Sequence, residues 1–240
     1  MERDNRIEVI RTQLRAMANP EKAAVLRRFF KTGPGEYGEG DKFLGITVPQ
    51  LRRLALACST ADEDFVRELL YSEFHEERLF ALLCLMAIYK RAGHDGQKRI
   101  FEMYLANTDR INNWDLVDIS APQIVGAYCE RGDRGRLYEL AVSRSLWERR
   151  IAIIATLHFI RLNDLTDTLQ ISRLLLSDQE DLIHKAAGWM LREAGKRDAS
   201  ALKAFLEHHA PFMPRTMLRY AIEKFPPAER RFWLIQKTKK

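Results

Sequence analysis

The chain has 240 residues, of which 46% are hydrophobic and 30% are charged, with only 12 glycines and 8 prolines. This composition excludes a disordered protein and disfavours a fold with many tight turns, so we expect an all-helical protein. Lys and Arg number 39 and Asp and Glu 33, a formal net charge of +6, which points to a polyanionic partner such as nucleic acid or an acidic membrane surface.

The cysteine spacing and the lengths of the apolar runs bear on the cellular compartment of the protein. Cys58, Cys84 and Cys129 are widely spaced and odd in number, which favours neither a disulfide framework nor a zinc site. Residues 1–18 lack the apolar core of a signal peptide, and no later run is apolar enough to span a membrane. We therefore expect a soluble cytoplasmic monomer without metal, cofactor or membrane contact.

Apolar residues recur at helical spacing along almost the whole chain, and turn signals separate the stretches. No segment shows the alternation of a strand. In chain order the predicted helices cover residues 4–17, 20–31, 48–58, 62–71, 75–91, 95–106, 113–130, 134–142, 146–162, 165–176, 181–196, 198–209 and 214–225.

A repeat of about 34 residues runs through these helices. Ser72, Ser143 and Ser177 are each followed nine residues later by an alanine; the second and third serines are 34 residues apart, and the first two are 71 apart, or two units. The unit between Ser72 and Ser143 would start at Asn107, and one further step of 34 residues from Ser177 reaches Pro211. Helix pairs of this length predict an α-solenoid, in which each pair buries its apolar side by stacking on its neighbours.

The repeat aligns residues of very different chemistry. Residues 146–160 are apolar on nearly every side beyond their first turn, as expected of a helix packed between neighbours. The position seven residues after each start carries Leu79, Trp114, Arg150 and His184. A solenoid places equivalent positions along its concave face, so we expect the functional residues there.

The segment Asn112–Asp118 places an indole beside a carboxylate. The asparagines are candidate N-caps, and Trp114 and Asp118 are four residues apart and share a helix face. Near a helix N-terminus the macrodipole favours an ionised carboxylate, which suits Asp118 to stabilising positive charge or orienting water. The alternative is a helix-start charge above a buried tryptophan.

Two further helix starts offer basic residues. Arg149 and Arg150 lie in a first turn, where free backbone N–H groups already attract anions, so they are candidate phosphate ligands; the alternative is a solvated arginine pair. In the next repeat, Trp189 follows Gly188, which allows close approach, although a lone tryptophan is more often a core residue. Lys185 and Arg192 are the candidate phosphate contacts of this repeat.

Four motifs resemble those of the AlkD family of DNA alkylation repair glycosylases, in order between about Asn19 and Glu223. They are Phe-Leu-Gly-Ile-Thr-Val-Pro at 43–49, Trp-Asp-Leu-Val-Asp at 114–118, Trp-Glu-Arg-Arg-Ile-Ala at 147–152 and Lys-Ala-Ala-Gly-Trp-Met-Leu-Arg-Glu at 185–193.

The resemblance implies a single domain over residues 1–240, a curved stack of HEAT-like repeats with double-stranded DNA containing alkylated bases in the concave groove. It implies a DNA glycosylase that releases cationic purines of the 3-methyladenine or 7-methylguanine type without a base-flipping pocket. Trp114, Asp118 and Trp189 would contact the sugar and backbone of the lesion nucleotide, and Arg150 a nearby phosphate. A carboxylate and two indoles suit the oxocarbenium-like sugar of such a reaction.

A Gly-rich loop at residues 32–42 departs from the pattern, because some members of the family lack it. Its glycines satisfy G-x-G-x-x-G, but no strand precedes them and three acidic residues would repel a pyrophosphate, so we expect a flexible loop instead of a nucleotide site. Two other functions stay open. One is a non-catalytic DNA-binding paralog, and the other is a protein-interaction scaffold with no nucleic-acid role.

Overall fold

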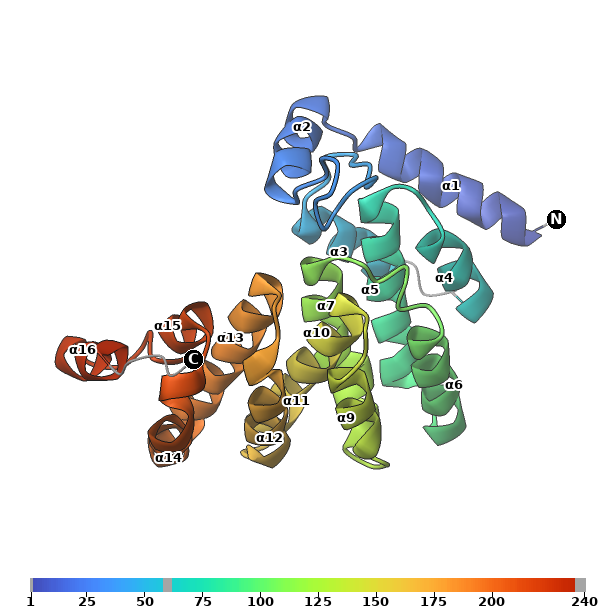
Figure 1. The fold of residues 1–240 in the computed structure, drawn as a ribbon. Coiled ribbons are helices and arrows are strands. Elements are labelled where there is room, and N and C mark those ends of the chain that lie inside the picture. Colours follow the sequence, from blue (N-terminus) through green and yellow to red (C-terminus); the bar gives the residue numbers. More distant parts are fainter. Residues whose placement is uncertain (1, 58–61, 236–240) are drawn as a thin grey trace. The chain divides into compact units, whose positions relative to one another are not determined.

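The structure, a computed structural model, describes residues 2–57 and 62–235 (Figure 1). The described residues form helices and contain no strand; an isolated bridge joins Lys42 to Phe74. The all-α prediction is therefore confirmed. Cys84 and Cys129 are buried and not joined in a disulfide, whereas Cys58 lies outside the described residues.

The chain divides into two compact units, Met1–Leu116 and Val117–Lys240, with the boundary inside helix α7 (Trp114–Ala121). The other helices of the first unit are α1 (Glu2–Ala16), α2 (Pro20–Phe29), α3 (Val48–Ala57), α4 (Glu63–Leu70), α5 (His75–Arg91) and α6 (His94–Leu105). The second unit contains η1 (Pro122–Gly126), α8 (Ala127–Cys129), α9 (Gly135–Ala141), α10 (Leu146–Ala155), α11 (Leu157–Arg161), α12 (Thr166–Leu174), η2 (Leu175–Ser177), α13 (Asp181–Arg197), α14 (Ala199–His209), η3 (Ala210–Phe212), α15 (Arg215–Ala221) and α16 (Pro227–Ile235).

The repeat found in the sequence corresponds to helix pairs. Each of its five starts is followed within a few residues by the first residue of a long or buried helix, namely α5, α7, α10, α13 or α15. A second helix or helical segment then completes the pair. The helical repeat is thus confirmed, but the position seven residues after each start is not strictly equivalent: Trp114 is the first residue of α7, whereas Arg150 is the fifth of α10.

Helix α5 is the centre of the first unit, where it packs against α3, α4 and α6. Its residues from His75 to Leu85 are all buried, including the polar side chains of its first turn. Helix α4 begins where the Asp62 carboxylate accepts a hydrogen bond from the Phe65 N–H (2.8 Å), and its apolar side faces α5. The unit therefore has one core, built around α5.

Helix α10 holds the corresponding place in the second unit, where it packs against α9, α12 and α13. Ser145 caps its N-terminus, and all six residues from Arg150 to Ala155 are buried. The sequence predicted one helix over 146–162, but the helix is interrupted at Thr156. The Thr156 hydroxyl donates to the Ile153 carbonyl (2.6 Å), and this bond to the preceding turn accompanies the break.

The predicted helix over 113–130 also changes geometry, because Pro122 lies inside it. Proline has no N–H to donate to the preceding turn, and the helix widens into a π-helical turn over Pro122–Gly126 before it resumes as α8. Gly126 packs directly on the Ala155 carbonyl, where any side chain would collide. The glycine is therefore required for the close packing of this turn on α10.

The sequence predicted no helix after residue 225, where Pro226 and Pro227 follow, so α16 was missed. Pro227 is instead the first residue of α16, a position where a missing N–H costs nothing, and Trp233 buries its indole. No helix in the described part of the chain is long and apolar enough to cross a membrane.

We expect Gly188→Ala to lower the free energy of unfolding by about 2 kcal/mol, because a Cβ there would lie 2.5 Å from the Met217 carbonyl oxygen in α15. Gly132→Ala is the matched control, since its Cβ would meet nothing closer than 3.7 Å. Urea denaturation of the two variants measures the difference. Equal stabilities would show that α15 moves away from α13 without cost.

Candidate functional site

Asp118 and Arg150 form a two-pronged ion pair in the second unit. Arg150 Nε donates to Asp118 Oδ1 and Nη2 donates to Oδ2, both at 2.9 Å. Arg150 Nη1 donates to the Leu182 carbonyl at the start of α13 (2.6 Å). The arginine is only 5% exposed, while the Asp118 side chain retains 17% exposure. Arg150 therefore fixes the orientation of a carboxylate that is still accessible.

The two residues meet because they hold the same place in neighbouring repeats. Asp118 is the fifth residue of α7, and Arg150 is the fifth residue of α10. Sequence reasoning missed the pair, because it aligned Trp114, not Asp118, with Arg150. Counting from the true helix start supplies the signal, and the same fifth position carries Leu79 in α5 and Lys185 in α13.

Arg149 and Arg150, which the sequence assigns to a phosphate, direct their donors to groups of the protein, and their contact with a phosphate stays a prediction. The Arg150 guanidinium is buried and its donors face Asp118 and a backbone carbonyl. Arg149 donates to both oxygens of the buried Asp178 (2.6 and 3.3 Å) and, through Nη1, to two backbone carbonyls. Both arginines therefore hold loop and helix ends together, because buried carboxylates and carbonyls take up their donors.

Trp114 packs into an aromatic cluster of the first unit. Its ring lies nearly parallel to Phe30, with a centroid distance of 5.1 Å and an interplanar angle of 19°. Phe29 approaches the indole edge-on at 5.8 Å. The tryptophan is half-buried, so both interpretations of the sequence hold in part: the ring packs on a core and also presents a surface.

A buried ionic network at the start of α5 and α7 was not foreseen. His75, 2% exposed, contacts Asp115 through Nε2 (2.8 Å) and Asp41 through Nδ1 (3.3 Å). Arg78 donates to the other oxygen of Asp41 (2.7 Å), and the Asn113 amide donates to Asp41 as well. The network joins residues 34 to 72 positions apart, so local sequence patterns contain no sign of it.

This network anchors the Gly-rich loop. Asp41, near the end of residues 32–42, is buried and has three partners, instead of lying in the flexible loop that the sequence suggested. Glu76 holds the segment that follows, since its carboxylate accepts hydrogen bonds from the N–H groups of Leu44, Gly45 and Ile46 (2.7–3.2 Å). The motif at 43–49 is therefore fixed by a buried acid of α5.

The charges of the network are coupled. Burial alone would lower the pKa of His75, but the Asp115 and Asp41 carboxylates outweigh it and raise the pKa to about 9. Burial opposes ionisation of Asp41, but its bond to His75 and the nearby Arg78 charge lower the pKa of that carboxyl. His75 is therefore a buried imidazolium at neutral pH, and it donates to two carboxylates.

Trp189 lies in the second unit beside a cavity of about 450 Å³ between α11 and α13. Its indole Nε1 donates to Glu193 one turn later (3.2 Å). Arg161, Lys196 and Arg197 also line this cavity. Gly188 before it is fully buried against α15, so the close approach that it allows is to a neighbouring helix.

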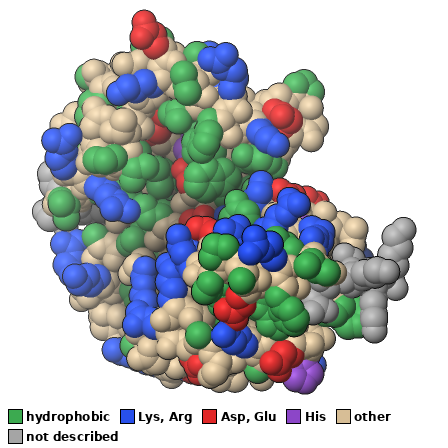
Figure 2. Space-filling view, turned by 90° about the vertical axis from the view of Figure 1, so that its left-hand side faces the viewer, with side chains coloured by type: hydrophobic (Ala, Val, Ile, Leu, Met, Phe, Trp, Pro, Cys, Tyr) green, Lys and Arg blue, Asp and Glu red, His purple; other side chains and the backbone are tan. Residues whose placement is uncertain are grey.

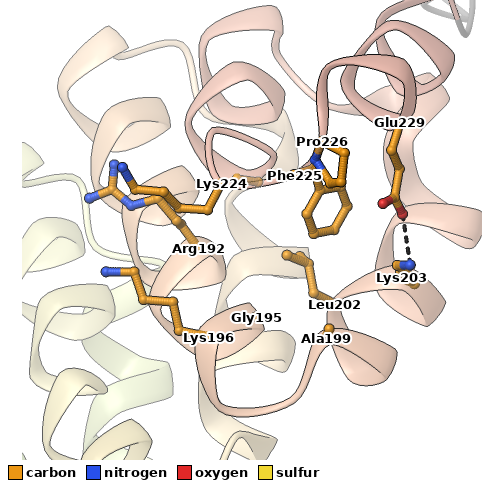
Figure 3. A pocket seen from close by; sticks show the side chains of 11 residues that line it. Arg192, Gly195, Lys196, Ala199, Leu202, Lys203, Lys224, Phe225, Pro226 and Glu229 are labelled. Carbon is orange, nitrogen blue, oxygen red and sulfur yellow. Dashed lines mark ion pairs between the residues drawn. The ribbon is translucent and has the colours of Figure 1, made fainter.

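Lys185 and Arg192 both contact acids on the surface. Lys185 pairs with Asp181 one turn earlier (2.7 Å), and Arg192 pairs with Glu223. Figure 3 shows Arg192, Lys196 and Lys224 pointing to the same side of a cavity of about 340 Å³. We call these three side chains the cationic cluster. Of its members, the sequence identified only Arg192.

Figure 2 shows one face of the molecule. Several Lys and Arg side chains lie side by side in the lower half of the view, and hydrophobic side chains gather in the upper half. No group of three or more His, Cys, Asp or Glu able to hold a metal ion is found in residues 2–57 and 62–235.

The raised pKa of His75 makes stability depend on pH. The unfolded histidine titrates near 6.5 and the folded one near 9, so its contribution is complete below pH 6.5 and is lost as the pH rises to about 9. The free energy of unfolding should fall by on the order of 3 kcal/mol over this range. Denaturant titrations at several pH values measure it, and His75→Gln should lack this slope. An equal slope in both proteins would rule out a buried imidazolium.

Comparison with known proteins places the chain in a family. The family model described as DNA alkylation repair enzyme matches residues 10–225. A predicted DNA alkylation repair enzyme from Enterococcus faecalis has a similar structure (TM-score 0.67, 16% identity, 88% of this chain and 98% of that one). AlkD2 from Streptococcus mutans is also similar (TM-score 0.56, 16% identity, 86% and 98%). No curated protein matches significantly. The chain belongs to the DNA alkylation repair enzyme family.

Proposed function

We propose that the protein is a DNA glycosylase of base excision repair. Its substrate is duplex DNA that carries cationic alkylated purines of the 3-methyladenine or 7-methylguanine type, and the reaction is hydrolysis of the N-glycosidic bond. The observation that carries the proposal is the partly exposed Asp118 carboxylate, held in one orientation by the buried Arg150 on the helix of the next repeat. The family match supports a DNA repair role.

The residue types fit this reaction. A cationic base is already a good leaving group, so the chemical demand falls on the sugar, which becomes oxocarbenium-like as the bond breaks. A carboxylate that is fixed in advance stabilises this charge without reorganising, and Asp118 is such a group. We propose that Trp114 and Trp189 contact the sugar and add cation-π attraction.

The role of Arg150 follows from its contacts. Because both of its Asp118 bonds and its bond to the Leu182 carbonyl are made inside the protein, we propose that it positions Asp118 and does not bind a phosphate. The cationic cluster and Lys185 are then the proposed backbone contacts of the second unit. Asp181 and Glu223, the partners of Lys185 and Arg192, lie on the surface, where ion pairs are weak and a phosphate competes effectively.

A non-catalytic DNA-binding protein is the second candidate. The observation in its favour is that Arg150 occupies both Asp118 oxygens, which reduces the negative charge available to a developing cation. Such a protein would bind duplex DNA with a steep dependence on salt and release no base. A time course of base release from methylated duplex DNA separates the two candidates.

Asp118→Asn should reduce the single-turnover rate of base release by at least about 100-fold, because the neutral amide does not stabilise the oxocarbenium-like sugar. Duplex affinity should stay nearly unchanged. Asp95→Asn is the matched control, since Asp95 is an exposed acid in the first turn of α6. Unchanged release by Asp118→Asn would refute the proposed mechanism.

Trp114→Ala should also abolish release, but it removes the packing on Phe30, so its stability has to be checked.

Arg150→Lys should slow base release while the salt dependence of duplex binding stays the same. A lysine does not make the two-pronged contact with Asp118, so the carboxylate loses its fixed orientation. Lys196→Met in the cationic cluster should instead reduce the slope of log K against log salt by about 1 and leave the rate in the bound complex nearly intact. A reduced slope of log K against log salt for Arg150→Lys would show that Arg150 contacts a phosphate, and it would contradict the proposed positioning role.

A further inference from the structure

Trp114 lies between two residues that belong to the network of a buried histidine. Asp115, which follows Trp114 in α7, contacts His75 Nε2 through Oδ2 (2.8 Å). Asn113, which precedes Trp114, donates from its amide to Asp41 (3.3 Å), and Asp41 is the second partner of His75. The residues on both sides of the indole are therefore connected to one imidazole ring at the start of α5.

The same imidazole also reaches the indole through aromatic side chains. His75 is stacked on Phe43 with ring centroids 4.7 Å apart, and its centroid lies 5.0 Å from that of Phe30. Phe30 is in turn stacked on Trp114, with centroids 5.1 Å apart. Phe30 therefore contacts both the imidazole and the indole, and a displaced imidazole would leave one side of Phe30 without support.

The imidazole of His75 is itself held in one orientation. It is 2% exposed, and a carboxylate oxygen lies within reach of each ring nitrogen. Ionised carboxylates accept hydrogen bonds and do not donate them, so both nitrogens are donors and the two bonds fix the plane of the ring. Asp115 Oδ1 has no hydrogen-bond partner in residues 2–57 and 62–235, so His75 is the side chain that holds this carboxylate.

Stability alone does not account for a charged network at this place. Removing charges from water is costly, and apolar side chains of similar volume often stabilise a buried position at least as well. Hydrogen bonds between fixed partners add a defined orientation. Trp114 is the residue that needs one, since it is half-buried and packs on Phe30 while it still presents a surface.

We propose that His75 is a positioning residue for Trp114. It acts through Asp115 and through Phe30, and it keeps the exposed surface of the indole in the orientation that a contact with the sugar requires. That the indole contacts the sugar of a lesion nucleotide rests on the proposed glycosylase function. The orientation of the indole depends on the contacts of the first unit alone.

The position of Trp114 can be measured without DNA, by fluorine NMR of protein labelled with 5-fluorotryptophan. The signal that disappears in Trp114→Phe belongs to this residue. We expect it to be narrow in the wild type and broadened or split in both His75→Gln and Asp115→Asn. Asp115→Asn removes no ring, so a lost ring current does not explain its effect. Phe65→Leu is the control, since Phe65 is buried in α4, outside the network; it should lower the unfolding temperature and leave the signal narrow.

Single-turnover base release measures the consequence for the reaction. His75→Gln and Asp115→Asn should each slow release by about tenfold while the affinity for duplex DNA stays the same, because a misplaced group costs rate more than binding. The double variant should be no slower than the slower single variant, since both changes break the same contact. Phe65→Leu should release bases at the wild-type rate.

The two measurements separate this proposal from the glycosylase. Broadened Trp114 signals in a protein whose wild type releases no base would support the positioning role and contradict the glycosylase. A narrow, unchanged signal in the variants, or normal release by them from an active protein, would overturn the positioning role, as would losses of rate that add up in the double variant. If His75→Gln does not fold, Asp115→Asn, which keeps the size of the side chain, decides the question.

Discussion

An inner helix such as α10 has no side that it can leave in water. From Arg150 to Ala155 every residue is buried, so the helix is stable only between neighbours that cover it on several sides. This constraint fixes the register of one repeat against the next, because a shift would expose apolar side chains or bury charged ones. Within that register, residues at the same distance from their helix starts face one another. The Asp118–Arg150 pair is a direct result.

The pair also shows why a buried charge is tolerated here. Removing an arginine from water is costly, and the cost is offset only when every donor finds an acceptor. Each of the three guanidinium nitrogens of Arg150 has an acceptor, namely the two Asp118 oxygens and the Leu182 carbonyl, which come from α7 and from the start of α13. One side chain thus ties three successive repeats together. The same hydrogen bonds of Arg150 both join the repeats and orient Asp118.

The apolar spacing and the turn signals of the sequence predicted most of the helices. Helix α5 begins and ends at the predicted residues, and α13 ends one residue later than expected, because both have strong apolar spacing and clear turn signals. The failures have physical causes. Pro122 and Thr156 alter hydrogen bonding inside helices whose apolar pattern continues unbroken. Pro227 starts a helix where two prolines suggested an end.

The candidate site was predictable only in part. Trp114 and Asp118 share α7 as their spacing indicated, whereas the contacts of Arg150 and His75 depend on partners far away in the chain. Such pairs form when tertiary packing brings helix starts together, and no periodicity of a single helix reveals them. The surface cations were easier to identify than their acidic partners.

The anchoring of the Gly-rich loop has a consequence for how this chain tolerates insertions. Residues 32–40 lie between α2 and α3 and contain no helix. Asp41 and the Glu76-bound segment 44–46 hold the chain immediately after the loop. A change of length at the exposed residues 34–36 therefore leaves the anchored segment and the helices of the unit in place.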